Sequence, residues 1–255
     1  MRKTITSLCT LLLLAGCSPQ HLRVNSSPDA PVVRKDERGV IADLRQLVAE
    51  AEAEDAWLYV PETKECHDIG LETTETEGVA MTVDYSLDKI RNVAAKHKRL
   101  RFYHIHPIKP FERIMRPNLE SPPEGYTAQR VKELLDFDNS TPSPQDMGVA
   151  IYLSCLYQHH QSKDLRYRLA SQDGITEYKP KMKELFDFCE FTEEKYLYHQ
   201  GMTLGENVAE RMSLESVEER IKRAVATKRP VHLFRNKYMD IIFWPYEAIG
   251  LHPQD

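Results

Sequence analysis

Two histidines lie two positions apart in the sequence His104-Ile105-His106-Pro107. Residues two apart on a β-strand project to the same face, so the two imidazoles would lie side by side and could bind one metal ion through nitrogen. The proline that follows favours an end of the strand just past the second histidine. The spacing therefore predicts a strand over residues 101–106 that ends in a pair of metal-binding side chains.

A carboxylate that could complete this site follows in the sequence Pro-Ser-Pro-Gln-Asp at 142–146. Ser143 is a typical helix N-cap, Pro144 suits the first helical position, and Asp146 then falls in the first turn, where the helix N-terminus stabilises negative charge. Two imidazoles and one carboxylate leave the fourth tetrahedral position of zinc open for water, as in catalytic zinc sites. The sequence therefore predicts one Zn²⁺ ion.

This combination resembles the JAMM (MPN-type, Mov34/JAB-like) metalloprotease family. The signature of that family is an upstream Glu, then His-x-His-Pro on a strand, then Pro-Ser-x-x-Asp at the start of a helix. The resemblance implies that His104, His106 and Asp146 bind zinc, and that Ser143 donates a hydrogen bond to the oxyanion of the tetrahedral intermediate. It also implies a peptidase or isopeptidase activity.

The resemblance covers roughly residues 37–180 and implies an α+β fold in which helices flank a central sheet. Residues 181–255 form a C-terminal extension, expected to pack on the same domain. The serine lies 37 positions after the second histidine, farther than in compact family members, so residues 108–141 are interpreted as an insertion. The five prolines between residues 107 and 125 predict a long surface loop that could cover the site.

The general base that the resemblance requires should lie where the first helix meets the first strand. Glu54 is the best match, and Asp55 and Glu62 are the alternatives. None of the three has the apolar and glycine neighbours usual in the family. A base positioned on the attacking water accelerates such a reaction by about 10²–10⁴-fold, so the identity of this acid decides between an active and an inactive site.

The N-terminus has the features of a secretory signal: a basic head at residues 1–3 and an apolar run over Ile5–Ala15. The run ends in Leu-Ala-Gly-Cys, which resembles a bacterial lipobox. We therefore expect a signal peptide at 1–16, lipidation (palmitate) of Cys17, and a flexible tether to residue 36. Ser18 suggests the periplasmic face of the outer membrane in a Gram-negative host. The expected location is the cell envelope, with the lipid as membrane anchor.

The rest of the chain alternates helical and strand patterns. Apolar spacing predicts helices over 37–55, 86–97 and 127–137, one from Pro144 onward, and one opened by a capping box at Ser216. Strands are expected at 57–60, 79–83, 231–234 and 239–244, and a hairpin at 165–169 and 175–178 around Asp173-Gly174.

Three cysteines remain once the signal peptide and the lipidated residue are set aside: Cys66, Cys155 and Cys189. Either one disulfide with a buried thiol or three buried thiols would fit this odd number. His159 and His160 end the helix that Asp146 opens, and they are expected to be solvated and to interact favourably with the helix dipole.

Composition excludes two function classes. The 255 residues hold 34 basic and 39 acidic side chains, a net charge of −5, and no apolar stretch is long enough for a multispan membrane protein. Loss of Arg2 and Lys3 with the signal takes the mature chain to −7. An acidic chain with one short basic run, at 96–101, is not typical of a nucleic-acid-binding protein.

Three functions fit these features unequally. The first is a lipid-anchored zinc hydrolase that cuts a protein or peptide of the envelope. The second is a catalytically inactive MPN-like scaffold lipoprotein that binds an envelope partner protein. The third, an amidohydrolase or phosphoesterase, would need further ligands on successive strands, and the other eight histidines give it little support.

Overall fold

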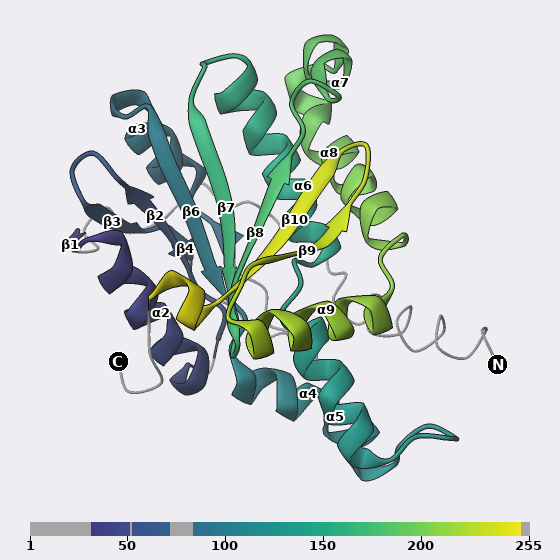
Figure 1. Cartoon of the computed structure of the whole chain (residues 1–255). Coiled ribbons are helices and arrows are strands. Elements are labelled where there is room, and N and C mark those ends of the chain that lie inside the picture. Colours follow the sequence, from purple (N-terminus) through teal and green to yellow (C-terminus); the bar gives the residue numbers. More distant parts are fainter. Residues whose placement is uncertain (1–31, 52, 72–83, 251–255) are drawn as a thin grey trace.

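A computed structural model describes residues 32–51, 53–71 and 84–250. The expected signal peptide, Cys17, most of the tether and the expected strand at 79–83 lie outside these ranges. Within them the chain forms a mixed α+β fold around an eight-stranded sheet, in the order β1-β3-β2-β6-β7-β8-β10-β9, beside a small pair β4-β5 (Figure 1). The expected α+β class is confirmed.

Neighbouring strands of the described sheet run antiparallel, with one exception: β6 and β7 are parallel. The strands are β1 (Val33–Arg34), β2 (Ala56–Val60), β3 (Glu65–Asp68), β4 (Gly70–Leu71), β5 (Asp84–Tyr85), β6 (Arg99–Ile105), β7 (Asp164–Ala170), β8 (Gly174–Pro180), β9 (Val231–Arg235) and β10 (Met239–Pro245). The predicted hairpin is β7–β8.

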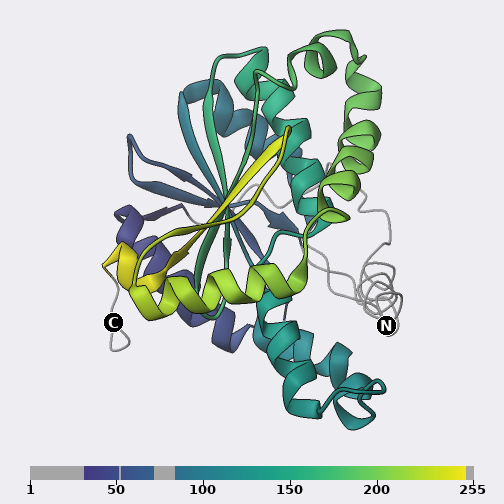
Figure 2. The same cartoon turned by 45° about the vertical axis from the view of Figure 1, so that its right-hand side comes forward.

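Helices cover both faces of the sheet (Figures 1 and 2). The larger core joins alternate strand residues to α3 (Leu87–Lys96), α6 (Pro144–Leu153), α8 (Glu194–Ala209) and α9 (Leu214–Thr227), and a smaller core joins the other face to α2 (Glu37–Glu50). None of the described helices has the length and apolar character needed to span a membrane.

The first part of the insertion is helical, which corrects the prediction of a proline-rich loop at 107–125, whereas the helix predicted at 127–137 is present. Helix α4 (Ile108–Glu120) follows Pro107 at its N-cap, and α5 (Ala128–Asp138) follows Thr127. Pro110 falls in the first turn of α4, where the missing N–H would be unpaired anyway, and Pro117 interrupts only its last turn. Together α4 and α5 project from the lower end of the molecule in Figures 1 and 2.

Three glycines let α6 and α8 approach backbone to backbone. A Cβ added to Gly205 would lie 2.2 Å from the carbonyl oxygen of Pro144, and one added to Gly148 would lie 2.8 Å from Cα of Met202. Gly201 has its own close contact, with the carbonyl oxygen of Gly148. Helix α8 therefore lies directly against the first turn of α6.

Residues beyond 180 continue this sheet and core. Helix α7 (Phe186–Phe191), α8 and α9 lead to β9 and β10, and β10 pairs with β8. Helix α9 begins one turn before the predicted capping box: Ser213, rather than Ser216, is its N-cap. Arg130 of α5 donates to both carboxylate oxygens of Glu218 at 2.5 and 2.6 Å, which connects the insertion to α9.

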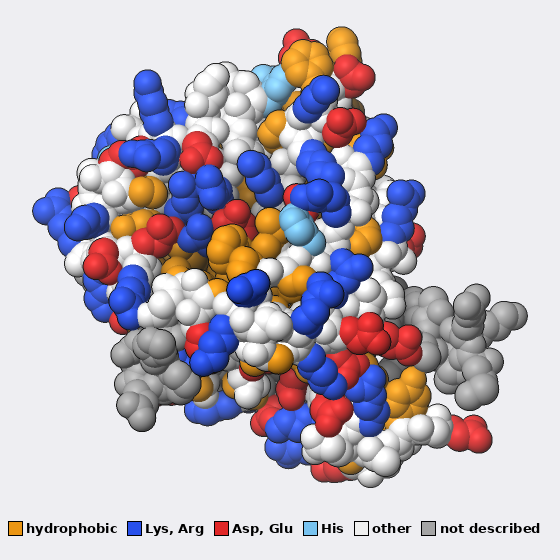
Figure 3. All heavy atoms as spheres, in the orientation of Figure 1, with side chains coloured by type: hydrophobic (Ala, Val, Ile, Leu, Met, Phe, Trp, Pro, Cys, Tyr) orange, Lys and Arg blue, Asp and Glu red, His pale blue; other side chains and the backbone are white. Residues whose placement is uncertain are grey.

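The face turned toward the viewer in Figure 3 is hollowed over the strands, with hydrophobic side chains in the hollow and Lys and Arg around it. Arg166 and Arg168 of β7 alternate with its buried residues and lie on the face opposite the larger core. Both form ion pairs with Glu177, at 3.8 and 2.9 Å respectively. Arg166 also lies 3.8 Å from Asp164, and Arg168 lies 2.6 Å from Glu37, so each arginine has two acidic neighbours within the fold.

Of the two cysteine arrangements compatible with the sequence, the structure has one disulfide and a buried thiol. Cys155 and Cys189 form a disulfide, and Cys66 is a buried free thiol. Cys155 lies in a short π-helix, η1 (Ser154–His159), that continues α6. Cys189 lies in α7, so the disulfide connects the end of the α6–η1 segment to the part of the chain that follows residue 180.

Candidate metal centre

Strand β6 presents the two histidines to the helix that carries the aspartate. Leu100 and Phe102 of β6 face the larger core that contains α6, and His104 continues the same alternation. Its neighbours in the sheet are Ala56 of β2 and Leu169 of β7. His106 follows the last residue of β6, and its N–H donates to the carbonyl of Ala170. The strand direction therefore persists through the second histidine.

The N-terminus of α6 positions the aspartate through a capping box. The backbone N–H of Asp146 donates to Oγ of Ser143 at 3.1 Å, and the backbone N–H of Ser143 donates to Oδ2 of Asp146 at 2.7 Å. Pro144 occupies the first turn, as the sequence predicts. This local geometry turns the carboxylate back over the helix end, toward β6.

The three side chains meet in the protein interior. His104 Nε2 lies 3.3 Å from Oδ1 of Asp146, and His106 Nε2 lies 3.5 Å from Oδ2. All three ligand atoms lie within 4.8 Å of one another, and the residues are 0%, 8% and 7% exposed. His104 Nε2 is buried without a hydrogen bond of acceptable geometry. Because a buried nitrogen without a partner is costly, this donor set fits a metal ion.

Two residues that the sequence analysis missed orient the imidazoles. The carbonyl oxygen of Asn139, at the end of α5, lies 3.0 Å from Nδ1 of His106, and its side-chain amide donates to the carbonyl of His106 at 3.1 Å. The hydroxyl of Tyr178 on β8 lies 3.4 Å from Nδ1 of His104. Outer partners of this kind, at Nδ1, leave the Nε2 atoms for the metal. They are 33 and 74 residues away in sequence, so no local spacing reveals them.

The charges of the cluster are mutually stabilising. Burial alone would raise the pKa of Asp146, but the two imidazoles outweigh it and hold that pKa well below its usual range. Burial alone would lower the pKa of His106, but Asp146, Glu54 and the Asn139 carbonyl together raise it to about 9. A cation is therefore favoured at this position, either as a proton or as a metal ion.

Of the three acids considered as the base, Glu54 is the one that reaches this cluster. Its Oε1 lies 3.9 Å from Nε2 of His106. Asp55 instead accepts from the N–H of Ala56 at 2.7 Å, and burial raises the pKa of its carboxyl to about 6. Glu62 accepts from the backbone and side chain of Arg99, at the opposite end of β6.

Comparison with protein-family models, with curated proteins and with solved structures found no match to this chain. The class of site is therefore defined by its own donor atoms. They form a buried His-His-Asp group that could bind a metal ion. A fourth predicted residue, Glu54, adds a second carboxylate beside it.

Proposed function

We propose that this protein is a lipid-anchored zinc hydrolase of the cell envelope, of JAMM type, that cleaves peptide or isopeptide bonds. The observation that carries the proposal is a second carboxylate, Glu54, 3.9 Å from one imidazole of the buried His104, His106 and Asp146 group. A structural zinc site needs four closed protein ligands, whereas three ligands and a neighbouring acid are typical of hydrolytic sites.

Each residue has a distinct role in this proposal. His104, His106 and Asp146 would hold the ion, which when bound acts as a Lewis acid toward a carbonyl group and acidifies water. Glu54 would take a proton from the attacking water and return it to the leaving amine. Ser143 accepts a hydrogen bond as N-cap, and its own O–H can donate to an oxyanion that develops beside the helix end.

Two features support an extracytoplasmic location. The Cys155–Cys189 disulfide is typical of oxidising compartments such as the periplasm. The lipobox-like sequence before Cys17 provides a signal and an anchor. A substrate in this location would be a protein or peptide of the envelope, reached from the membrane surface by the tether.

Zinc content and peptidase activity of the full-length protein in detergent test the proposal together. We expect wild type to hold one more equivalent of zinc per chain than Asp146→Ala. Asp88→Ala is the matched control, because Asp88 also lies in the first turn of a helix, α3, and pairs with Arg91. Equal zinc in wild type and Asp146→Ala would contradict the proposal and favour the catalytically inactive scaffold.

The base is tested separately, with fluorogenic linear peptides and peptides joined through a lysine side chain. Glu54→Gln should keep its zinc and lose about 10²–10⁴-fold in kcat. Glu62→Gln, which changes an acid at the far end of β6, should retain full activity. Undiminished cleavage by Glu54→Gln would remove Glu54 from the mechanism.

A further inference from the structure

A second group of metal-ligating side chains lies at the other end of the α6–η1 segment. Nε2 of His159 lies 3.1 Å from Oε2 of Glu190, and ligand atoms of His159, His160 and Glu190 all lie within 4.8 Å of one another. Asp146 opens this segment and His159 closes it, so at 1.5 Å per residue the two groups are roughly 20 Å apart. The two groups are therefore separate.

The π-helical turn at the end of η1 brings the two histidine side chains together. His159 is the last residue of η1, where the N–H of His160 donates to the carbonyl of Cys155, five residues back. This wide turn places two consecutive imidazoles with ring centroids 4.8 Å apart. The ring of Phe186 lies 5.0 Å from that of His159 and limits its rotation. The first imidazole therefore contacts both Glu190 and Phe186, and the second packs against the first.

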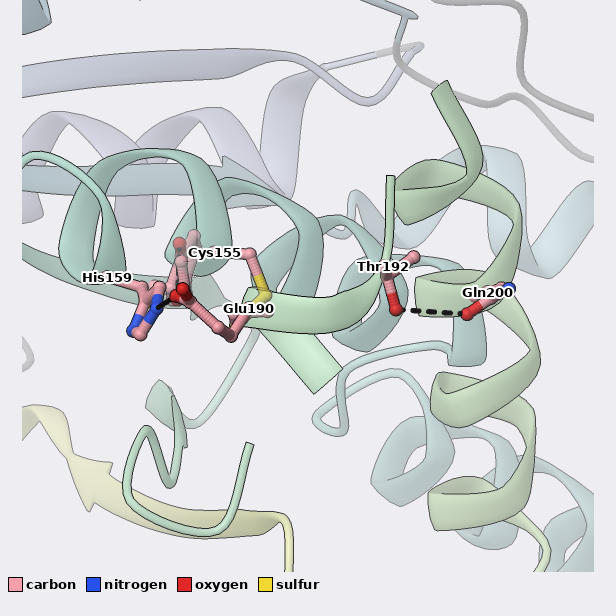
Figure 4. The surroundings of a disulfide bond; sticks show 8 residues. Cys155, His159, Glu190, Thr192 and Gln200 are labelled. Atoms are coloured by element: carbon pink, nitrogen blue, oxygen red, sulfur yellow. Dashed lines mark hydrogen bonds and ion pairs between the residues drawn. A yellow bond between two sulfur atoms is a disulfide. The ribbon is translucent and has the colours of Figure 1, made fainter. Parts of the chain in front are cut away.

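The disulfide joins the two segments that supply the ligands (Figure 4). Cys155 lies one turn before the histidines, and Cys189 directly precedes Glu190. Helix α7, which carries Glu190, has only six residues and would not be stable alone. The covalent bond and the burial of Cys189 therefore fix the carboxylate opposite His159.

We propose that His159, His160 and Glu190 form a second, surface site for a divalent transition-metal ion such as Zn²⁺, held in register by the Cys155–Cys189 disulfide. Two imidazole nitrogens and a carboxylate suit zinc, copper or nickel better than calcium or magnesium, which prefer all-oxygen sites. His160 and Glu190 are exposed, so water completes the coordination and the ion exchanges with the surroundings. Reduction of the disulfide would release α7 and weaken the site.

Zinc binding is measured on the full chain in detergent, in the Asp146→Ala background that removes the buried site. We expect one equivalent of zinc per chain, and none after His160→Ala and Glu190→Gln are added. His199→Ala, an exposed histidine of α8, is the matched control and should keep the equivalent. All three substituted residues are exposed, so we do not expect the variants to unfold. The midpoint of thermal unfolding of each variant checks this.

Copper supplies an independent readout. With Cu²⁺ in the same background, electron paramagnetic resonance should show two nitrogen ligands, and His160→Ala should leave one. Replacing Cys155 and Cys189 together by Ser should weaken binding at least tenfold. Absence of bound metal in the background variant, or binding unchanged by His160→Ala and Glu190→Gln, would overturn the site. Unchanged affinity without the disulfide would overturn its part in the proposal.

Discussion

Ser143 and Asp146 hold each other by two reciprocal hydrogen bonds: each backbone N–H donates to the other residue's side chain, at 2.7 and 3.1 Å. The same carboxylate lies within 3.5 Å of both imidazoles. Asp146 is thus a member of the capping box of α6 and a candidate metal ligand at once. The capping box fixes the direction of the carboxylate before any ion binds, so the start of α6 and the metal centre depend on each other.

Replacing Ser143 by Ala tests this dependence. Loss of the cap should lower the free energy of unfolding by about 1 kcal/mol, because the N–H of Asp146 loses its acceptor. If the hydroxyl also stabilises an oxyanion, kcat should fall by about 10²–10³-fold while zinc is retained. Chemical denaturation and peptidase assays measure the two effects. Ser86→Ala, which removes the cap of α3, should reproduce the stability loss without the loss of kcat.

Tyr178→Phe removes the hydroxyl that lies 3.4 Å from Nδ1 of His104. We expect zinc affinity at the buried site to fall by about 10–100-fold, because the imidazole loses its outer partner. Competition with a fluorescent chelator measures this affinity. Tyr167→Phe is the control, since that hydroxyl bonds Ser154 instead, at 2.8 Å. Equal affinities in the two variants would show that Tyr178 does not orient His104.

Gly205→Ala should be destabilising, although Ala is favoured over Gly in a helix by about 1 kcal/mol. The new Cβ would lie 2.2 Å from the carbonyl oxygen of Pro144, and a backbone atom cannot rotate away. We expect a net loss of about 1–3 kcal/mol in unfolding free energy, with weaker zinc binding as the first turn of α6 moves. In Gly39→Ala the nearest atom is the N-cap oxygen Oδ1 of Asp36 at 3.2 Å, so only a shift of a few tenths of an ångström is needed and the change in stability should stay within about 1 kcal/mol. Wild-type stability in Gly205→Ala would contradict the close packing.

Asp55→Asn should stabilise the protein above pH 6 and have no effect in acid. Burial raises the pKa of Asp55 from 3.8 to about 6, so the folded state holds the proton more tightly than the unfolded state. The ionised carboxylate therefore costs stability above pH 6, and the cost shrinks as the pH falls through 6 and disappears below about 4. Partial exposure limits the gain from Asn to about 1–2 kcal/mol at pH 7.5.

Urea denaturation of wild type and Asp55→Asn at pH 7.5, 6 and 5 would measure this difference. The Asn side chain retains an oxygen to accept from the N–H of Ala56, so the local turn is preserved. Asp88→Asn is the matched change at an exposed acid. A gain that stays constant from pH 7.5 to 5 would show that the charge of Asp55 is not its source.

Local patterns in the sequence predicted the strand with two histidines and the helix that begins beside Ser143. Strand alternation and helix capping depend on neighbours a few residues away, and both are visible in a single chain. The roles of Asn139 and Tyr178 are not visible in this way, because these residues contact the histidines only after β8 joins the sheet and α5 folds back. The prediction for the insertion failed for a different reason. Pro110 and Pro117 suggested a loop, but they occupy the first and last turns of α4, where a helix tolerates proline.

The parallel pairing of β6 with β7 makes the insertion part of one long connection between two neighbouring strands. Arg99 pairs with Asp164, so the whole segment between them is one closed loop, and residues 108–141 make up about half of it. Doubling the length of such a loop costs only about 0.6 kcal/mol of chain entropy. The chain entropy of the loop therefore does not fix the length of the insertion. What fixes α5 in place is its packing, through the Arg130–Glu218 pair and the contact of Asn139 with His106. Length changes within α4 would therefore leave the spacing of His104, His106 and Asp146 in the fold unchanged.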